Sequence, residues 1–409
     1  MKILYVAMAV VAPGSHGGAT HVVEVASELA KLGHELHVVC AYEGKESQAE
    51  LLLPVEGGLT IHFYRFRRSD KTALLRYPQL VRLAANLKPD LVMERYYNFA
   101  GIGLLYARRH KLPSILEVNA LMVDPPGSFK YRMDGLLLRR MEWWATRQCE
   151  WAGRIVTPLH TTVPAKIPRT KIAELPWGAN VDRFDPANLP ELELVKLRRE
   201  LGLPSRQEGA RVAVFAGSFR HWHGVEKLVE AALQLVPTDP LLYFLLLGGG
   251  PELETIRALV RQHGLEERIL TPGAVAHSKI PLYLALADCG VAPFDTSKHL
   301  PLRHAGFFWS PLKIFEYMAM KLPTITIDLP PLNQIIRPGQ EGLLFKEGDV
   351  SDLAQRLQEL LAPGAEAEHC RETMGRLARQ RVVEHFSWAS HVRALDRLIA
   401  ELTSPAVKV

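Results

Sequence analysis

Cysteine is scarce in this sequence, and no cysteine occurs in a metal-binding pattern. The four residues, Cys40, Cys149, Cys289 and Cys370, lie far apart and form no CxxC pair. Zinc sites and disulfide frameworks use closely spaced cysteines, so this spacing argues against both. It fits a reducing compartment, and we expect a cytoplasmic protein without a bound metal.

Long apolar runs are also missing. A membrane-spanning helix needs roughly 20 apolar residues, and no segment approaches that length. The run of eleven residues from Ile3 to Pro13 superficially resembles a signal peptide. It is β-branched, however, and a glycine-rich turn and a helical pattern follow it instead of a small-residue cleavage site. We therefore interpret it as a buried first strand.

Neither sign of charge dominates, and the net charge is +5. Residues 1–180 contain 23 Lys and Arg against 16 Asp and Glu, whereas the remainder contains 26 against 28. The basic first half favours an anionic partner, such as the inner face of a membrane contacted peripherally. Ordinary scatter over a large surface explains the difference equally well. We expect no nucleic-acid partner.

What the sequence does contain is a repeated alternation of strand-like and helix-like stretches. The 409 residues suffice for two domains of roughly 150–200 residues each. Continuous apolar strands separated by helices indicate parallel sheets covered on both faces, so the predicted class is α/β. The expected strands are KILYVAMAV, ELHVVCAY, DLVMERY, PSILEVNA, RVAVFAG, LYFLLLGGG, RILTPG, CGVAPF, PTITID and EGLLF.

The alternation is interrupted near residue 180. It stops at Pro176-Trp177-Gly178 and restarts at Arg211, and WGANVDRFDPANLP between them has the composition of a linker. We therefore predict an N-terminal domain over 1–180 and a C-terminal domain over 181–386. The last helix, within about 387–409, has no strand after it, and we expect it to pack back on the first domain.

Ligands of open parallel sheets bind beyond the carboxyl ends of the strands, and two such ends have unusual loops. In APGSHGGATH, the glycines 14, 17 and 18 precede a helix expected to start near Thr20. Its free N–H groups favour an anion, although a plain tight turn has the same composition. In FAGSFRHWHG, the strand ends at Gly217, and Arg220, His221 and His223 crowd the following loop. Cations at this place favour a diphosphate.

Two further strand ends carry candidate residues. GGGPELETI (248–256) is glycine-rich and has a proline suited to the first turn of a helix, a pattern that turn chemistry alone also explains. In SPLKIFEYMAM, Ser310 is expected to cap a helix that aims free N–H groups near Leu312 and Lys313 at the ligand. Glu316 lies one turn on, where a carboxylate would accept hydrogen bonds from vicinal hydroxyls. A surface ion pair between Lys313 and Glu316 is the ordinary alternative.

PSILEVNA places Glu117 and Asn119 at another strand end. Glu117 is either a catalytic carboxylate or a structural partner of a nearby arginine. A long helical stretch starting at Tyr131, YRMDGLLLRRMEWWATRQCEWAGR, combines arginines with tryptophans. This combination suits a membrane interface, and core packing is the ordinary explanation of the tryptophans.

These stretches, in this order and spacing, resemble the family-four glycosyltransferases, the large retaining group with the GT-B fold. The resemblance covers nearly the whole chain. It implies two Rossmann-like, doubly wound domains facing across a cleft, with the acceptor on the N-terminal domain and the donor mainly on the C-terminal one. The matching stretches are PGSHGGATHVVEVASELAKLGHELHVV, WGANVDRF, FAGSFRHWHGVEKLVEAA, LLGGGPELETI, ILTPGAVAHSKIPLYLALADCGVAPF, SPLKIFEYMAMKLPTITID and EGLLFKEGD.

The resemblance implies an enzyme that moves a hexosyl unit from a nucleotide-diphosphate sugar to a saccharide or lipid-linked acceptor, in the synthesis of a surface polysaccharide or glycoconjugate. No cofactor besides the donor is expected, and no metal, because protein cations and helix ends stabilise the leaving diphosphate. Glu316 would hold the ribose, and Gly17 and Gly18 would lie near the diphosphate or acceptor. The other donor-binding candidates are Gly217, Ser218, His223, Gly249, Val275, Ser310 and Leu312.

Some positions depart from the family pattern. Ser218 and His223 stand where Arg and Lys usually bind the diphosphate, so we expect Arg220 and Lys313 to supply the charges. Phe308 stands in the place of the first glutamate of the Glu-x7-Glu pattern. The candidate catalytic residues are therefore Arg220, Lys313, Glu117 and Asn119, although Asn119-Ala120 occupies the place of a frequent His-Asp pair.

Three other functions remain open at this stage. A nucleotide-sugar epimerase of the same fold would turn over the donor without an acceptor. A catalytically silent nucleotide-sugar-binding subunit would explain the substitutions at Ser218, His223 and Phe308. A nicotinamide oxidoreductase needs a GxGxxG loop and an acidic residue on the next strand, and the first loop lacks that spacing.

Overall fold

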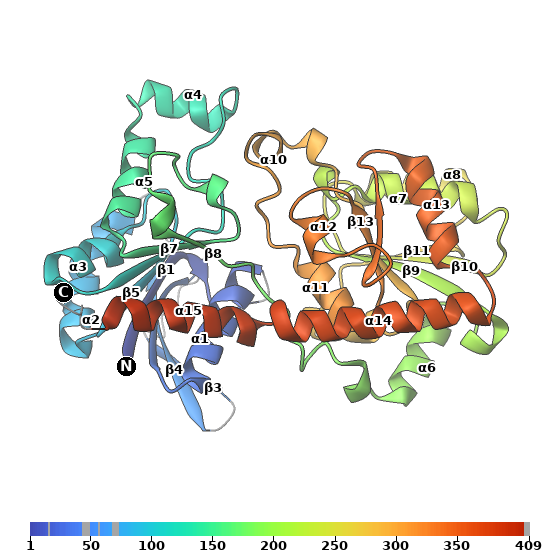
Figure 1. Ribbon diagram of the computed structural model, residues 1–409, viewed down its shortest axis with the longest axis horizontal. Coiled ribbons are helices and arrows are strands. Elements are labelled where there is room, and N and C mark those ends of the chain that lie inside the picture. Colours follow the sequence, from blue (N-terminus) through green and yellow to red (C-terminus); the bar gives the residue numbers. More distant parts are fainter. Residues whose placement is uncertain (15–16, 43–49, 56–57, 68–72, 405–409) are drawn as a thin grey trace. The chain divides into compact units, whose positions relative to one another are not determined.

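The computed structural model describes residues 1–14, 17–42, 50–55, 58–67 and 73–404 (Figure 1). It divides into two compact units. Unit 1 comprises Met1–Trp177, His304–Ser310 and Trp388–Val409, and unit 2 comprises Gly178–Arg303 and Pro311–Ser387. Each unit is built on a mainly parallel sheet with helices, which confirms the predicted α/β class.

The sheet of unit 1 has the strand order β3-β4-β2-β1-β5-β6-β7-β8. All neighbours are parallel except β3 and β4, which pair antiparallel at one edge. The chain order reverses between β1 and β5, so the carboxyl ends of these two strands form the usual ligand-binding point of such a sheet. The strands are β1 (Lys2–Val11), β2 (Glu35–Tyr42), β3 (Glu50–Val55), β4 (Leu59–Arg67), β5 (Leu91–Arg95), β6 (Ser114–Glu117), β7 (Arg154–Thr157) and β8 (Ile172–Glu174).

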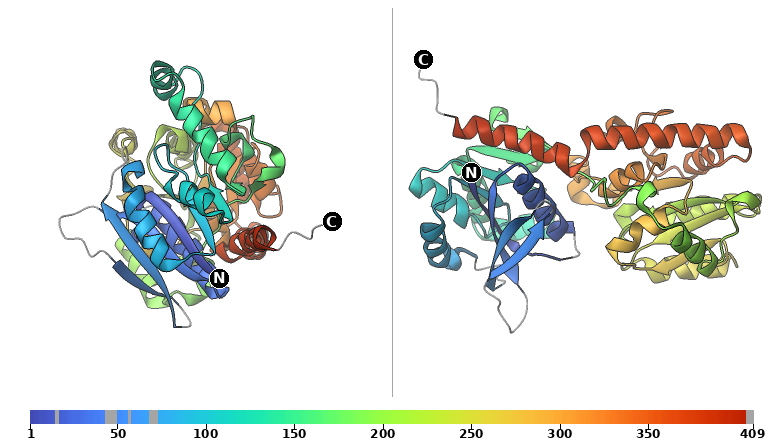
Figure 2. Two further views of the ribbon diagram at one scale, coloured as in Figure 1. Left: turned by 90° about the vertical axis from the view of Figure 1, so that its left-hand side faces the viewer. Right: turned by 90° about the horizontal axis from the view of Figure 1, so that it is seen from below.

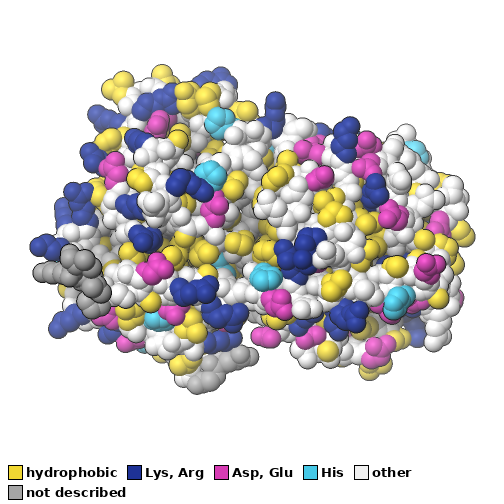
Figure 3. All heavy atoms as spheres, in the orientation of Figure 1, with side chains coloured by type: hydrophobic (Ala, Val, Ile, Leu, Met, Phe, Trp, Pro, Cys, Tyr) yellow, Lys and Arg dark blue, Asp and Glu magenta, His cyan; other side chains and the backbone are white. Residues whose placement is uncertain are grey.

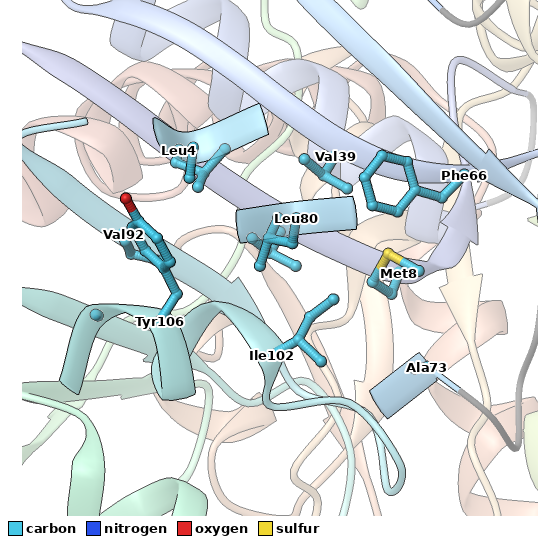
Figure 4. Close-up of a cluster of buried hydrophobic side chains, with 12 residues drawn as sticks. Leu4, Met8, Val39, Phe66, Ala73, Leu80, Val92, Ile102 and Tyr106 are labelled. Carbon is cyan, nitrogen blue, oxygen red and sulfur yellow. The ribbon is translucent and has the colours of Figure 1, made fainter. Parts of the chain in front are cut away.

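The core of unit 1 lies where helices cover this sheet. Figure 4 shows part of it: Leu80 of α2 and Ile102 and Tyr106 of α3 pack against side chains of the central strands, among them Leu4 and Val92. The central strands are buried along most of their length because both faces are covered, whereas the edge strands β3 and β8 are partly exposed. The helices of unit 1 are α1 (Gly17–Lys31), α2 (Tyr77–Leu87), α3 (Ile102–His110), α4 (Phe129–Leu136), α5 (Arg140–Trp151) and α15 (Trp388–Thr403).

The sheet of unit 2 is entirely parallel, with the order β11-β10-β9-β12-β13-β14. Its chain order reverses between β9 and β12. The strand β9 is buried at every position, as expected for a strand at the centre of a parallel sheet. The strands are β9 (Arg211–Ala216), β10 (Leu242–Leu247), β11 (Ile269–Gly273), β12 (Cys289–Ala292), β13 (Thr324–Ile327) and β14 (Gly342–Phe345).

One helix of unit 2, α11, follows the reversal point and carries the lysine and glutamate singled out above. Its residues Ile314, Phe315 and Met318 are buried, and α14 packs along it. The helices are α6 (Glu191–Glu200), α7 (Val225–Leu235), α8 (Leu253–Gln262), α9 (Ile280–Leu284), α11 (Leu312–Ala319), α12 (Leu332–Ile335), α13 (Val350–Leu360) and α14 (Ala365–His385), and α10 (Leu300–Ala305) spans the division between the units.

The last helix, α15, belongs to unit 1 and packs against α1. The His34 Nε2 atom lies 2.9 Å from an oxygen of Asp396, which joins the end of α1 to the middle of α15. Figure 2 gives two further views of α15 and the sheet that it accompanies. In the described part of the chain, no helix has the length and apolar character needed to cross a membrane.

Some elements differ from the expectation. The antiparallel pair β3 and β4 and the short strands β7 and β8 were not predicted, because they lack continuous apolar runs. Helix α1 begins at Gly17 rather than near Thr20, so Gly17 and Gly18 form its first turn. The predicted turn residues Ser15 and His16 lie outside the described residues.

A close backbone contact holds α14 against the end of α11. An added Cβ at Gly375 would come within 2.1 Å of the carbonyl oxygen of Lys321. Gly375→Ala is therefore expected to destabilise unit 2 by about 1–3 kcal/mol, because neither backbone can move aside easily. Urea unfolding followed by circular dichroism measures the change.

The matched control is Gly135→Ala in α4, where nothing lies within 4 Å of an added Cβ. This change is expected to be neutral or to stabilise by up to about 1 kcal/mol, because alanine favours a helix over glycine. Similar losses of stability from both substitutions would contradict a specific contact at Gly375.

Candidate functional site

The candidate site of unit 2 surrounds the carboxyl ends of β9 and β12, where the strand order reverses. The loops after β9, β10 and β11 are joined there by backbone hydrogen bonds: Gly217 donates to Leu247, Phe219 to Gly249, and Gly248 to Gly273, each at 2.9 Å. The loops are so close that an added Cβ at Gly248 would come within 1.7 Å of a backbone oxygen. Glycine is therefore required by packing as well as by its positive φ of 137°.

Lys313 of α11 extends into this strand end. Its Nζ atom lies 4.1 Å from the centroid of the Phe215 ring and 5.0 Å from that of Phe294. An added Cβ at Gly217 would lie only 2.8 Å from the same nitrogen. The side chain as a whole is half-buried, but the Nζ atom is buried and has no hydrogen-bond partner among the described residues.

Burial lowers the pKa of Lys313 from 10.5 to about 7, and the charge of Glu316 offsets only part of this effect. Two aromatic faces stabilise an ammonium group by cation–π attraction, yet they donate no lone pair to its N–H groups. An anion placed beside Gly217 would provide both charge and acceptors. The amine is thus poised to bind a negatively charged group.

Glu316, one turn further along α11, is mostly buried. Its Oε1 atom lies 3.1 Å from Nε2 of His277, so its partner is this histidine and not Lys313. The alternative of a surface ion pair between Lys313 and Glu316 is therefore wrong. The carboxylate has a second oxygen with which it would accept further hydrogen bonds.

The predicted cap of α11 is also wrong. Pro311 occupies the N-cap position, and no side chain caps the helix there. The Ser310 Oγ atom instead accepts a hydrogen bond of 3.0 Å from the backbone N–H of Trp177. Because the first turn has no side-chain cap, the N–H groups of Leu312 and Lys313 stay free to donate to a ligand.

The loop after β9 contains the predicted cluster of Arg220, His221 and His223. The Nδ1 atom of His223 donates a hydrogen bond of 2.6 Å to the carbonyl oxygen of Ser218. Burial, with the neighbouring charges of Lys313 and Arg220, lowers the pKa of His223 to about 3. His223 is thus neutral at neutral pH, so it does not serve as the cation expected from its place in the loop.

Arg220 is exposed, like His221 and unlike His223. Its guanidinium group stacks 5.2 Å from the centroid of the Trp222 ring, and the solvated face stays available. Gly249 and Val275 lie just beyond β10 (Leu242–Leu247) and β11 (Ile269–Gly273), respectively. Pro251, expected in the first turn of α8, precedes the N-cap residue Glu252 instead.

The candidate site of unit 1 contains a buried network around Glu117. Its carboxylate accepts a hydrogen bond of 2.5 Å from the hydroxyl of Tyr5, contacts Nε2 of His21, and lies 3.7 Å from a guanidinium nitrogen of Arg95. Tyr5, His21 and Glu117 are all fully or almost fully buried. Both carboxylate oxygens of Glu117 are thus occupied within unit 1. This favours a structural role for Glu117, as the partner of an arginine, over a role as a catalytic carboxylate.

The charges of this network are arranged around the carboxylate. Burial alone would raise the pKa of Glu117, but His21, Arg95 and the Tyr5 hydroxyl lower it to about 2. Burial lowers the pKa of His21 to about 4. Since His21 is then neutral at neutral pH, the cation that balances Glu117 is Arg95, and the neutral ring donates its Nε2 proton.

Two tryptophans of unit 1 pack against this network: Trp177, the last residue of the first segment of the unit, and Trp388, the first residue of its last segment. The rings of Trp177 and Trp388 lie with their centroids 4.3 Å and 5.1 Å from that of His21. The indole N–H of Trp177 donates to Oδ1 of Asn119 at 2.8 Å, while the Nδ2 atom of Asn119 is buried without a partner among the described residues. Asn119 therefore orients Trp177 and retains an unused donor.

Sequence reasoning missed several of these residues. His21 lies on a helical face that reads as ordinary core, and Trp177 was assigned to the linker. Phe308, in the place of the family's first glutamate, is buried in the segment His304–Ser310, which belongs to unit 1. Glycines 14 and 17 lie near the end of β1, with Gly17 exposed in the first turn of α1. In the described ranges, no cluster of three or more His, Cys, Asp or Glu residues is suited to a metal ion.

Comparison with known proteins agrees with this geometry. Residues 15–182 match the family described as Glycosyltransferase Family 4, and residues 210–363 match that described as Glycosyl transferases group 1. Two Rossmann-like units with these strand orders define the GT-B architecture. The chain belongs to the family-four glycosyltransferases, a class of enzymes that transfer sugars from nucleotide sugars.

Among curated relatives, the alpha-D-kanosaminyltransferase of Streptomyces kanamyceticus is 26% identical over 196 residues, which cover 47% of this chain and 46% of that protein. The alpha-monoglucosyldiacylglycerol synthase of Acholeplasma laidlawii is 22% identical over 81% of this chain and 82% of that protein. The chain spans about half to two thirds of the length of the first three curated relatives that it matches, 46%, 64% and 45%.

Solved structures share the fold. A glycosyltransferase from Rickettsia africae superimposes with a TM-score of 0.74 at 19% identity, covering 99% of both chains. The Anabaena protein HepE in complex with UDP-glucose superimposes with a TM-score of 0.68 at 16% identity, covering 98% of this chain and all of that one.

The buried amine of Lys313 is expected to make the folding stability of the protein depend on pH. Between pH 7 and 10.5 the unfolded chain binds a proton that the folded chain has lost, so folding stability rises with pH in this range. Replacing the amine by an apolar chain of similar length, Lys313→Met, is expected to stabilise the ligand-free protein on the order of 2–4 kcal/mol at pH 6.5. The advantage should fade as pH approaches 10.

Urea titrations of both proteins at pH 6.5, 8 and 9.5 measure this difference. The exposed Lys279→Met is the control, and its effect should be small at every pH. A Lys313→Met effect that is the same at all three values would show that the amine is not desolvated in the folded protein.

Proposed function

We propose that the protein is a retaining hexosyltransferase that uses a nucleotide-diphosphate sugar as donor. The observation that supports this most strongly is the buried amine of Lys313, which lies against Gly217 at the strand reversal of unit 2 and has no hydrogen-bond partner in the described part of the chain. Structures of this class bind ligands at that reversal. The free N–H groups at the start of α11 add a positive dipole end beside the amine.

The diphosphate would lie between Lys313, the uncapped start of α11 and the loop around Gly217 and Ser218. Arg220 would approach from the solvent side. Each of these groups stabilises negative charge, and charge on the leaving diphosphate increases as the glycosidic bond breaks. Lys313 and Arg220 would thus act on the transition state more than on the bound donor.

Glu316 would bind the hydroxyls of the ribose. His277 occupies one of its oxygens, which fixes the orientation of the carboxylate and leaves the other oxygen for a ligand. Val275, Gly249 and Leu312 would complete the surface around the nucleotide. UDP is the nucleotide to test first, because the similarly folded HepE was solved in complex with UDP-glucose.

The acceptor would bind unit 1, near Gly17, Gly18 and Asn119, whose Nδ2 group has no hydrogen-bond acceptor among the residues that the structure describes. The relative from Acholeplasma laidlawii is named for a diacylglycerol product, which supports a lipid-linked acceptor over a free sugar. Glu117 would serve as a positioning residue that holds the wall of this site through Tyr5 and His21, and not as the base.

The transfer itself would need no protein base. The bond between the anomeric carbon and the phosphate oxygen breaks, and the acceptor oxygen forms the new bond on the same face of the sugar. The acceptor's proton passes to the departing phosphate oxygen. The protein's part is then to orient both substrates and to stabilise the diphosphate.

A nucleotide-diphosphate panel tests the donor site by thermal shift. A nucleotide present at 100 times its Kd should stabilise the protein by about 2.7 kcal/mol, and UDP is expected to do so. Glu316→Ala should reduce the shift, because one ribose contact is lost. The exposed Glu267→Ala, also in unit 2, should leave the shift unchanged.

Three outcomes would count against the proposal. Stabilisation by NAD(P) alone would favour an oxidoreductase, and conversion of a nucleotide sugar without any acceptor would favour an epimerase. Nucleotide binding without hydrolysis or transfer to any lipid or saccharide acceptor would favour the silent binding subunit.

A further inference from the structure

Helix α4 and the elbow that follows it expose large apolar side chains to solvent. Phe129, Leu136 and Leu138 are 76%, 78% and 82% exposed, and Met133 and Leu137 are also exposed. Trp143, one turn into α5, is 55% exposed. We call these six residues the α4 patch. Single exposed apolar residues are ordinary, but a contiguous group of this kind marks a binding surface.

The spacing of these residues shows that α4 is amphipathic and that its apolar face points toward solvent. Phe129, Met133 and Leu136 follow one another at intervals of four and three residues, so they share one face of the helix. Tyr131 and Asp134 occupy the opposite face and are turned inward. A surface helix usually buries its apolar face. Here the helix buries a carboxylate and presents its apolar face to solvent.

The elbow between α4 and α5 is built to hold this orientation. The buried carboxylate of Asp134 accepts hydrogen bonds of 2.8 and 3.1 Å from the backbone N–H groups of Met141 and Glu142. Leu138 and Arg139 both adopt left-handed backbone conformations, with φ of 54° and 58°. The guanidinium of Arg139 then lies 3.7 Å from the centroid of the Tyr131 ring. These contacts fix two strained residues whose conformation projects Leu138 outward.

Cations surround the apolar side chains. Between Phe129 and Arg147 the chain carries five cations and two acids, and of the acids Asp134 is buried beneath α4. Two of the cations, Lys130 and Arg147, lie 3.7 Å from Asp124 and 2.9 Å from Glu150. Figure 3 shows apolar and basic side chains side by side over α4 at the top of unit 1. In Figure 1 and Figure 2, α4 lies at the outer end of unit 1, beyond α5. The cations are Lys130, Arg132, Arg139, Arg140 and Arg147.

We propose that the α4 patch inserts into the interfacial region of an anionic lipid bilayer, with the surrounding Lys and Arg side chains contacting lipid phosphates. Phe, Leu and Trp side chains insert at the boundary between headgroups and acyl chains, and flanking cations attract anionic lipids. The core of a protein–protein interface is instead depleted of charge, so the interleaved cations favour a lipid surface over a protein partner. The proposal rests on α4 and its elbow alone and does not depend on the proposed transfer reaction.

Vesicle flotation of the full chain tests the proposal. The protein is expected to float with vesicles of phosphatidylglycerol and phosphatidylcholine at low salt, and much less with phosphatidylcholine alone. Leu136→Ser combined with Leu138→Ser should reduce the bound fraction at least about tenfold, because two inserted side chains are lost. Arg132→Glu combined with Arg140→Glu should do so for anionic vesicles, since each cation contributes roughly a fivefold gain in partition.

The matched controls are on α6 of unit 2. Leu192 is 82% exposed, the same as Leu138, but it lies between two glutamates. Leu192→Ser and Lys196→Glu should leave flotation unchanged. Thermal unfolding of every variant should match the parent protein, because the replaced side chains make few contacts within the fold.

Two results would overturn the proposal. One is the absence of flotation with anionic vesicles, or flotation that the α4 variants do not weaken. The other is a dimer in the absence of lipid, measured by light scattering, that the Leu136→Ser and Leu138→Ser protein loses. That result would assign the patch to a second copy of the chain.

Discussion

The close approach of Lys313 to Gly217 is the constraint on which the candidate donor site depends. The amine lies between two aromatic rings and touches the backbone at the end of the central strand of unit 2, where no side chain could replace hydrogen at Gly217 without displacing it. The helix behind the lysine is buried and apolar, so it keeps the amine away from solvent. A solvated lysine would need no such helix, and it would also gain nothing from an uncapped helix start beside it.

Two buried charged groups, one in each unit, have opposite surroundings. Glu117 in unit 1 has its carboxylate oxygens occupied by Tyr5, His21 and Arg95, so its charge is compensated before any ligand arrives. The amine of Lys313 is buried and finds no hydrogen-bond partner among the described residues, which destabilises the folded protein. Natural proteins accept such a cost chiefly where a ligand removes it. This contrast is why we assign Glu117 to the scaffold and Lys313 to the site.

The sequence allowed the main features of the fold to be predicted because parallel strands buried on both faces read as continuous apolar runs. It allowed the loops after β9 and β10 to be singled out because glycine is required there by backbone contacts. Patterns of adjacent residues do not show long-range partners, so the pairing of Glu316 with His277 and the place of Ser310 beside Trp177 were not foreseen. The cap of α11 that was expected from Ser310 is absent, and a helix start without a side-chain cap is the arrangement that the helix-dipole argument needs.

Helix α4 shows most clearly what periodicity leaves open. A stripe of Phe129, Met133 and Leu136 predicts one apolar face, and it gives no indication of whether that face meets the core or the solvent. The direction is decided by Asp134, which bonds to the start of α5 and so turns the opposite face inward. The left-handed backbone at Leu138 and Arg139 costs free energy, and the chain would not need this conformation if the leucines of the patch packed inward. The hydrogen bonds of Asp134 and the strained backbone both keep the apolar side chains of the α4 patch on the outside of the protein. This arrangement is best explained if the patch lies in an environment that is less polar than water.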